Sequence, residues 1–325
     1  MWDFNIGHAL GAMIKTAPFV IFRIIIYVGI AVAYVLAVGV GAGIGYGIGS
    51  IGDEPGGFAF YGGLFGFGIV SAALYWAREY LLYLVKAGHV AVLVEHFDGN
   101  ALPGGRGQIE HAQAVVKERF AEASVLFGVD RLIKGILRAL NRLVMSVATF
   151  LPIPGLRELA GFVNKILNVS LTYTDEIILA YNIRTRSENP WDSSKDALIL
   201  YAQNYKVIAK NAVFLLLFMY AVSLFIFLII LAPVGALMAL FPGSVGGVSF
   251  IIALVFAWAL KAALLEPLAI AALMQVYFKA IEGQVPNPEW DQKLTAASNK
   301  FRDLKDKAAA HLSPDAPPAD VTVGG

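Results

Sequence analysis

The sequence contains no cysteine, and this absence excludes several kinds of chemistry at once. Disulfides, thiolate metal sites and cysteine nucleophiles all need a thiol. Charge is also scarce, because only 15% of the residues are charged, against about 25% in an ordinary soluble chain. The net charge is only +1, far from the dominant basic surface that nucleic-acid binding needs. We therefore expect no nucleic-acid partner.

Long hydrophobic stretches take the place of charge. Hydrophobic residues make up 58% of the chain, and its mean hydropathy is +0.67. Uncharged sequence covers residues 24–52, 55–77 and 211–260. A helix needs about 20 apolar residues to cross a bilayer core of about 30 Å, so the third stretch is long enough for two crossings, divided by a turn at 241–247. The sequence predicts an all-α, polytopic α-helical membrane protein with two transmembrane hairpins.

These hairpins divide the chain into five parts. We expect a first transmembrane hairpin with a helical exit (1–98), a cytoplasmic and membrane-interfacial helical region (99–205), a second hairpin (206–282), a cytoplasmic amphipathic helix (283–312) and a disordered tail (313–325). Within the middle region, residues 143–182 form two apolar pieces interrupted by prolines. They either cross the membrane, re-enter it or lie on its surface, because broken helices are tolerated where they face a cavity. The number of spans is therefore four to six.

Basic residues flank the open ends of both hairpins and are absent from the two turns. The flanking residues are Lys15, Arg23, Arg78, Lys86, Lys206, Lys210, Lys261 and Lys279. Because cytoplasmic loops carry an excess of lysine and arginine, both termini and the middle region are predicted to be cytoplasmic. The expected location is the plasma membrane or a bacterial inner membrane, with several crossings.

Glycine occupies every second position in part of the first hairpin. With about 100° per residue, these glycines form two faces on opposite sides of a helix. One face holds Gly39, Gly43 and Gly47, and the other holds Gly41, Gly45 and Gly49. Small residues let helix backbones approach closely in lipid. We expect one face to meet the hairpin partner, where Gly62 and Gly66 repeat the spacing, and the other to meet the second hairpin or another subunit of a homo-oligomer.

A basic stripe follows in the middle region. Four basic residues recur at spacings of three and four, with apolar residues between them: Arg131, Lys134, Arg138 and Arg142. This pattern is typical of a helix that lies on a bilayer and contacts anionic headgroups. The alternative is the solvated face of an ordinary cytoplasmic helix.

Candidate binding residues cluster near position 175. Tyr173, Asp175, Glu176 and Tyr181 place acids and aromatic rings in an apolar segment. Acids within a membrane segment usually face a cavity or a partner, and aromatic rings beside a carboxylate suit an organic cation. The alternative is a polar helix end with both acids in water. Lys261 and Glu266 are interpreted as an ion pair near the headgroups, with a buried coupling role for Glu266 as the alternative.

Nothing in the sequence favours an enzyme. Zinc sites need three or four converging ligands, and His89, Glu95 and His96 lack a convincing further one. Residues 47–52 match a dinucleotide-binding fingerprint letter for letter, but they lack the strand before and the helix directly after that this motif requires. We expect no metal and no cofactor.

The two hairpins share the order of several features. Each opens on a lysine with alanine and phenylalanine, carries a Trp-Ala pair before a basic residue, and leads to an acid-glycine-proline loop and a charged helix. Transporters are often built from such repeats. The alternative is that any two helical hairpins with basic flanks look alike.

Two short stretches resemble the choline transporter-like family. Residues 201–216 are similar to that family's tyrosine, asparagine-aromatic and alanine-lysine-asparagine-alanine series before a late membrane helix. Residues 129–134 look like another of its segments, and together the stretches cover about a tenth of the chain. The resemblance implies transport of choline or a related amine.

Two functions follow from these patterns. The first is a transporter-like protein for a small solute, a cationic one being favoured, with Tyr173, Asp175, Glu176 and Tyr181 at its site. The second is an oligomeric membrane scaffold that transports nothing and organises membrane or cytoplasmic partners through its basic helix. The order of the hairpins favours the first, and the glycine faces favour the second.

Overall fold

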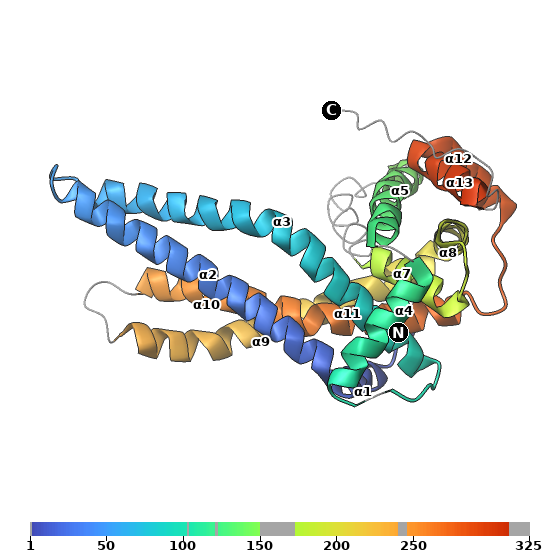
Figure 1. Ribbon diagram of the computed structural model, residues 1–325, viewed down its shortest axis with the longest axis horizontal. Coiled ribbons are helices and arrows are strands. Elements are labelled where there is room, and N and C mark those ends of the chain that lie inside the picture. Colours follow the sequence, from blue (N-terminus) through green and yellow to red (C-terminus); the bar gives the residue numbers. More distant parts are fainter. Residues whose placement is uncertain (1, 103, 121–122, 150–172, 240–245, 312–325) are drawn as a thin grey trace.

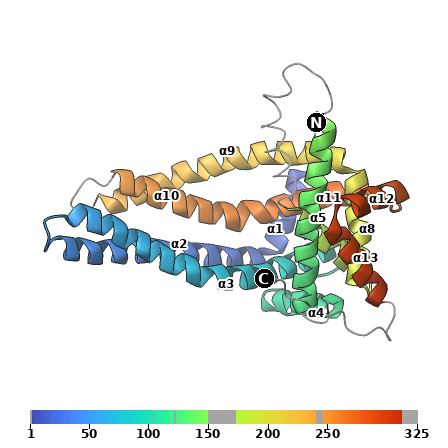
Figure 2. The ribbon, with the colours of Figure 1, turned by 90° about the horizontal axis from the view of Figure 1, so that it is seen from above.

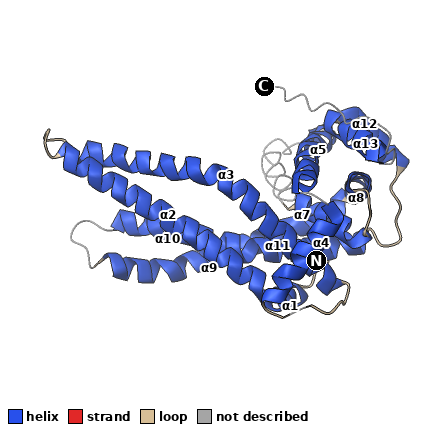
Figure 3. Cartoon of the chain, viewed as in Figure 1, coloured by secondary structure: helices blue, strands red, loops and turns tan. Residues whose placement is uncertain are grey.

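The computed structural model describes residues 2–102, 104–120, 123–149, 173–239 and 246–311. The regular secondary structure of these residues is all helical, with loops and turns between the helices (Figure 3). The α-helices are α1 (Ile6–Lys15), α2 (Ala17–Gly49), α3 (Pro55–Phe97), α4 (Arg106–Phe120), α5 (Ala123–Thr149), α7 (Thr174–Thr185), α8 (Pro190–Gln203), α9 (Tyr205–Met238), α10 (Gly246–Leu260), α11 (Glu266–Ala280), α12 (Pro288–Ala297) and α13 (Asn299–His311). A short π-helix, Lys261–Leu265, joins α10 to α11.

Four helical segments are long and apolar enough to cross a membrane. They are Ala17–Gly49, Pro55–Tyr75, Tyr205–Met238 and Val248–Ala280. Their outer faces carry many exposed large hydrophobic side chains, such as Ile25, Phe65 and Phe225, which suit contact with lipid rather than water. The predicted all-α, polytopic membrane class is confirmed.

The spans form two long hairpins that extend from a compact group of helices, here called the helical domain (Figure 1). The hairpins are α2 with α3 and α9 with α10, and they lie side by side (Figure 2). The main core lies in the helical domain and combines buried side chains from helices far apart in the sequence, among them Ala12, Val90, Ile136, Ile177, Leu198, Leu273 and Phe301. The helical domain, to which α1 and α13 belong, lies opposite the turn between α2 and α3.

The glycines of α2 bring its backbone against that of α3. A β-carbon added at Gly45 would lie 2.0 Å from the carbonyl oxygen of Phe58, and one at Gly66 would lie 2.1 Å from that of Ala37. Gly41 and Gly62 meet in the same way. The second glycine face differs, since β-carbons at Gly39, Gly43 and Gly47 would have no atom of the described residues within 4 Å.

The last spanning helix is interrupted by a π-turn. Pro267 has no backbone N–H and cannot continue an α-helical hydrogen-bond ladder. Just before it, the N–H of Glu266 donates to the carbonyl of Lys261, which is the wider spacing of a π-helix. This turn sets the position of Glu266 on the inner side of the bundle, beside the cavity described below.

Several expected boundaries are refined by the structure. Residues 283–312 were expected to form one amphipathic helix, but they contain two, α12 and α13, separated by Ser298 in an extended conformation. Of the segment 143–182, residues 150–172 lie outside the described residues, while α7 packs inside the helical domain against α3, α5, α8 and α11. Most of the turn at 241–247 and the tail at 313–325 also lie outside the described residues.

Candidate functional site

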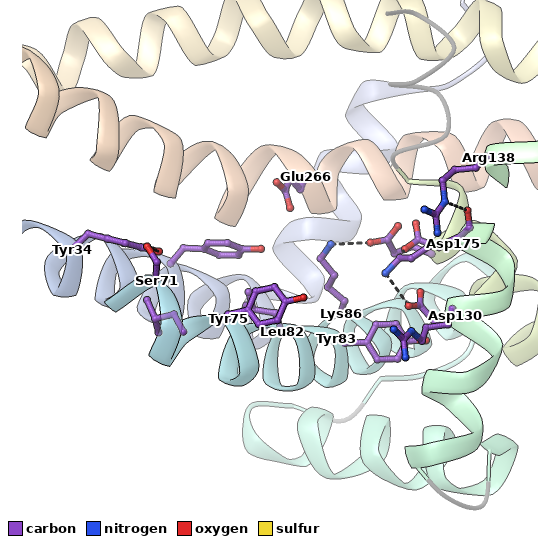
Figure 4. A pocket seen from close by; sticks show the side chains of 15 residues that line it. Tyr34, Ser71, Tyr75, Leu82, Tyr83, Lys86, Asp130, Arg138, Asp175 and Glu266 are labelled. Atoms are coloured by element: carbon purple, nitrogen blue, oxygen red, sulfur yellow. Dashed lines mark hydrogen bonds and ion pairs between the residues drawn. The ribbon is translucent and has the colours of Figure 1, made fainter. Parts of the chain in front are cut away.

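A cavity of about 680 Å³ lies where the first hairpin meets the helical domain (Figure 4). Its walls come from α2, α3, α5, α7 and the first residue of α11. This volume is within the range of roughly 300–1,000 Å³ that is usual for small-molecule sites. Charged side chains gather near the helical domain, and tyrosines continue toward the spans.

The most buried ion pair of the cavity joins α3 to α7. Lys86 Nζ lies 2.9 Å from Glu176 Oε1, and the side chains are 26% and 4% exposed. Lys86 is on the part of α3 that continues beyond the span into the helical domain, and Glu176 is in the first turn of α7. A carboxylate is favoured at a helix N-terminus, so the local structure also supports a charged Glu176.

A second ammonium group, that of Lys134, lies close to two carboxyl groups. Lys134 Nζ on α5 lies 2.8 Å from Asp130 Oδ2 and 3.5 Å from Asp175 Oδ2. The side chains of Asp130 and Asp175 are only 4% and 11% exposed. The ammonium group is therefore shared, and the closer contact is with Asp130.

The neighbouring carboxyls of Asp175 and Glu176 have opposite pKa shifts. Burial raises the pKa of Asp175 well above its usual value, and the charge of Glu176 and a hydrogen bond to Glu176 add to this effect. For Glu176, burial opposes ionisation, but the charge of Lys86 and hydrogen bonds from Asp175 and Lys86 outweigh it and lower the pKa to about 2. The shifts thus favour the neutral form of Asp175 and the ionised form of Glu176.

Tyrosines line the end of the cavity that enters the spans. Tyr27 and Tyr34 come from α2 and Tyr75 from α3, whereas Tyr83 of α3 lies beside the charged cluster, with Lys134 Nζ 5.8 Å from the centre of its ring (Figure 4). The hydroxyl of Tyr34 lies 3.2 Å from Ser71 Oγ, where the cavity ends toward the turn. Tyrosine provides an aromatic face as well as a polar hydroxyl, so this lining suits a ligand with both apolar and polar parts.

Two further charges lie on the membrane side of the cluster. Glu266 lines the cavity, and no ion pair joins it to Lys261 or to any other residue that the structure describes. Arg23 on α2 is fully buried, and its guanidinium makes no hydrogen bond within the described part of the chain. Both affect the pKa of Lys86, which Glu176 raises most: the charge of Glu266 raises it further, and the charge of Arg23 lowers it.

The predicted site residues separate into two groups. Asp175 and Glu176 both line the cavity and are buried rather than surrounded by bulk water. Tyr173 is buried just before α7 but does not line the cavity, and the ring of Tyr181 lies 6.3 Å from that of Tyr277 on α11, inside the helical domain. The structure thus brings the two acids together, leaves Tyr173 beside the charged cluster but outside the cavity lining, and directs Tyr181 elsewhere.

The basic stripe of α5 faces this cavity. Arg131, Lys134 and Arg138 line it, while the apolar residues between them, such as Ile133 and Ile136, are buried in the main core. These apolar side chains are therefore used in protein packing and are not available to enter lipid. The side chain of Arg142 lies outside the described residues. Contact of the stripe with anionic headgroups stays a prediction.

Sequence reasoning missed the partners of the two acids. Lys86 lies 90 residues before Glu176 and Lys134 lies 41 residues before Asp175, yet each pairs with that acid. The sequence indicates Lys86 only as a basic residue that flanks the first hairpin. The available clue is that Lys86 follows Tyr75 and Tyr83 on the same helix, α3.

Comparison with family models, with curated proteins and with solved structures finds no match for this chain.

Proposed function

We propose that this integral membrane protein is transporter-like and binds a small charged solute in the cavity between the first hairpin and the helical domain. The observation that carries the proposal is the position of Asp175 and Glu176, which are buried and line a cavity that also reaches Tyr34 and Ser71 in the spans. A polar path from the domain into the spans is what solute entry requires, whereas a pure scaffold has no need of one.

The depth of the cavity supports an opening on one side only. Tyr34 is 15 residues before the end of α2 at Gly49, or about 23 Å at 1.5 Å per residue. If the turn lies at the far surface of a core of about 30 Å, the cavity enters by about 7 Å and stops short of the midplane. Beyond it, the glycine contacts between α2 and α3 close the path. Transport would then require a second conformation in which these helices separate.

The basic residues at the open ends of the hairpins support a cytoplasmic opening. We therefore place both termini and the helical domain on the cytoplasmic side of the plasma membrane or of a bacterial inner membrane. A cationic solute fits the four tyrosines of the lining and the carboxyl of Glu266, which forms no ion pair with the residues that the structure describes. Choline is the first probe because of the sequence resemblance described above.

Uptake of radiolabelled choline into proteoliposomes that contain the full-length protein tests the proposal. We expect uptake above that of empty liposomes, and a loss of about tenfold or more in Glu176→Gln, because this change removes the partner of Lys86 from the cavity wall. Glu289→Gln on α12 is the matched control, since Glu289 pairs with Lys293 on the exposed surface. Equal uptake by Glu176→Gln and wild type would remove Glu176 from the site, and no uptake by any of them would contradict choline transport.

The open glycine face supports a second candidate, an oligomeric scaffold. Gly39, Gly43 and Gly47 form a smooth strip of α2 that no described residue covers. Such a strip allows close approach of a helix from another subunit. This candidate requires self-association in the membrane and no solute flux, so the uptake measurement also separates the two functions.

A further inference from the structure

The charged cluster of the cavity contains more buried acids than cations to pair with them. Three carboxyl groups form ion pairs with only two ammonium groups. The acids are Asp130, Asp175 and Glu176, and the cations are Lys86 and Lys134. Lys86 pairs with Glu176, and Lys134 is shared by the two aspartates. An unpaired ionised carboxylate is very costly in a buried site, and such a group takes up a proton instead.

We infer that this cluster is a proton-binding site that holds one proton between Asp175 and Glu176 at neutral pH, and that a cationic solute replaces this proton. The inference rests on the proposed function, because it names the exchange that occurs at the same site. The proton leaves the Asp175 carboxyl for water as the cation enters, so the net charge of the cavity is unchanged. No covalent bond to the solute forms.

The geometry indicates why Asp175 carries the proton. Glu176 has Lys86 at 2.9 Å, and Lys134 lies closer to Asp130, at 2.8 Å, than to Asp175, at 3.5 Å. Asp175 is therefore the acid with the weakest pairing. As a neutral carboxyl it becomes a hydrogen-bond donor, and Glu176 beside it is the acceptor. The raised pKa of Asp175 and the lowered pKa of Glu176 agree with this arrangement.

The excess of acid holds for the ion pairs at close range, where three carboxyls meet two ammonium groups, and not for the cavity lining as a whole. On the membrane side, Arg23 of α2 and Glu266 of α11 add one charge of each sign. Two tyrosines, Tyr83 on α3 and Tyr173 before α7, are neutral at physiological pH. On α5, Arg131 and Arg138 also line the cavity and are exposed like Lys134, and Arg138 Nε donates to the carbonyl of Lys134.

Infrared spectroscopy of the full-length protein in detergent tests the proton directly, through the carbonyl stretch of a protonated carboxyl. We expect this band at neutral pH in the wild type, and its Asp175 component is the difference between the wild-type and Asp175→Asn spectra, in which any contribution of Glu266 cancels. Asp130→Asn should lose the same component, because Lys134 then pairs with Asp175 alone and the numbers of acids and ammonium groups within the ion pairs become equal. Asp303→Asn, which changes a surface acid paired with Lys300, is the control and should keep the band.

Two results would overturn the proton site. The first is the absence of the band in the wild type at neutral pH, and the second is a band of unchanged intensity in Asp175→Asn. An unchanged band in Asp130→Asn would contradict the argument from unequal numbers of acids and cations. These readouts need no transport, so they separate the proton site from the proposed function.

The exchange is tested by adding choline to the same preparations in weak buffer with a pH-sensitive dye. We expect proton release from the wild type and from Asp303→Asn, and none from Asp130→Asn, which has no proton to release. Choline binding without proton release by the wild type would overturn the exchange. The infrared band without any choline binding would instead contradict choline as the solute and leave the proton site standing.

Discussion

Gly41 and Gly62 touch through their backbones, because a β-carbon on either one would collide with the carbonyl oxygen of the other. A β-carbon on Gly41 would lie 2.2 Å from the carbonyl oxygen of Gly62, and one on Gly62 would lie 2.1 Å from the carbonyl oxygen of Gly41. Both contacts are with backbone atoms, which cannot rotate away as a side chain can. This reciprocal contact holds α2 and α3 together at the level where the polar cavity has already ended.

We predict that Gly41→Ala destabilises the protein by about 3 kcal/mol, the upper part of the usual range for overpacking. Gly43→Ala, two residues further on the open face, should change stability by less than about 0.5 kcal/mol apart from any gain in helix propensity. Thermal unfolding of both variants in the same detergent measures the difference. Equal melting temperatures would contradict the close contact between α2 and α3.

Removing one partner of the Lys86 and Glu176 pair should be more harmful than removing both. Glu176→Gln or Lys86→Met is expected to cost about 3 kcal/mol, because each leaves a buried charge without its counter-charge. The double variant with Lys86→Met and Glu176→Gln should recover much of that loss. Denaturant unfolding of the four proteins gives the coupling energy of the pair, and additive effects would show that the two side chains act independently.

The pH dependence of stability should have opposite signs at the two neighbouring acids. The folded pKa of Glu176 is about 2 against an ordinary 4.5, so its contribution is fully present above pH 4.5 and is lost as the pH falls toward 2. Asp175 has a raised folded pKa against an ordinary 3.8, so its contribution is present below pH 3.8 and is lost as the pH rises through the folded pKa.

Asp175→Asn should therefore be more stable than the wild type at neutral pH, because an amide keeps the hydrogen bond to Glu176 without a proton that can be lost. The advantage should shrink as the pH is lowered toward 3.8, the ordinary value for aspartate. Melting temperatures across this pH range provide the measurement. A variant that is less stable than the wild type at neutral pH would show that Asp175 is ionised there.

Self-association is predicted to depend on the open glycine face. Gly43→Leu fills the strip formed by Gly39, Gly43 and Gly47 and should reduce any oligomer, because a large side chain keeps another helix at a distance. Gly68→Leu on α3 is the control, since a β-carbon there also meets no described atom. Light scattering after size-exclusion chromatography measures the mass of each variant. An unchanged oligomer in Gly43→Leu would place the interface elsewhere.

The sequence predicted the features that depend on neighbouring residues. Long uncharged stretches are sufficient to indicate membrane-spanning helices, because each helix satisfies its own backbone hydrogen bonds and meets lipid along its length. Glycine spacing likewise predicted close packing between α2 and α3, which depends only on the period of the helix. The acids at 175 and 176 stood out because charge is rare in an apolar segment.

The pairing of charges was decided only by the tertiary structure. Glu176 meets Lys86 and Asp175 meets Lys134, although α3, α5 and α7 are separate in sequence. Nothing local distinguishes these lysines from others that flank a span, because an ion pair depends on where helices cross. The same holds for Tyr181, whose position on α7 turns it toward Tyr277 and away from the cavity.

The chain by itself therefore determined that the protein is helical and enters a membrane, since hydrophobicity and helical period are properties of each segment. The packing of α5 and α7 against the long extension of α3 decided that Asp175 and Glu176 share a cavity with two lysines and a third acid. The protonation of that cluster depends on distances between helices, and only the folded chain sets those distances.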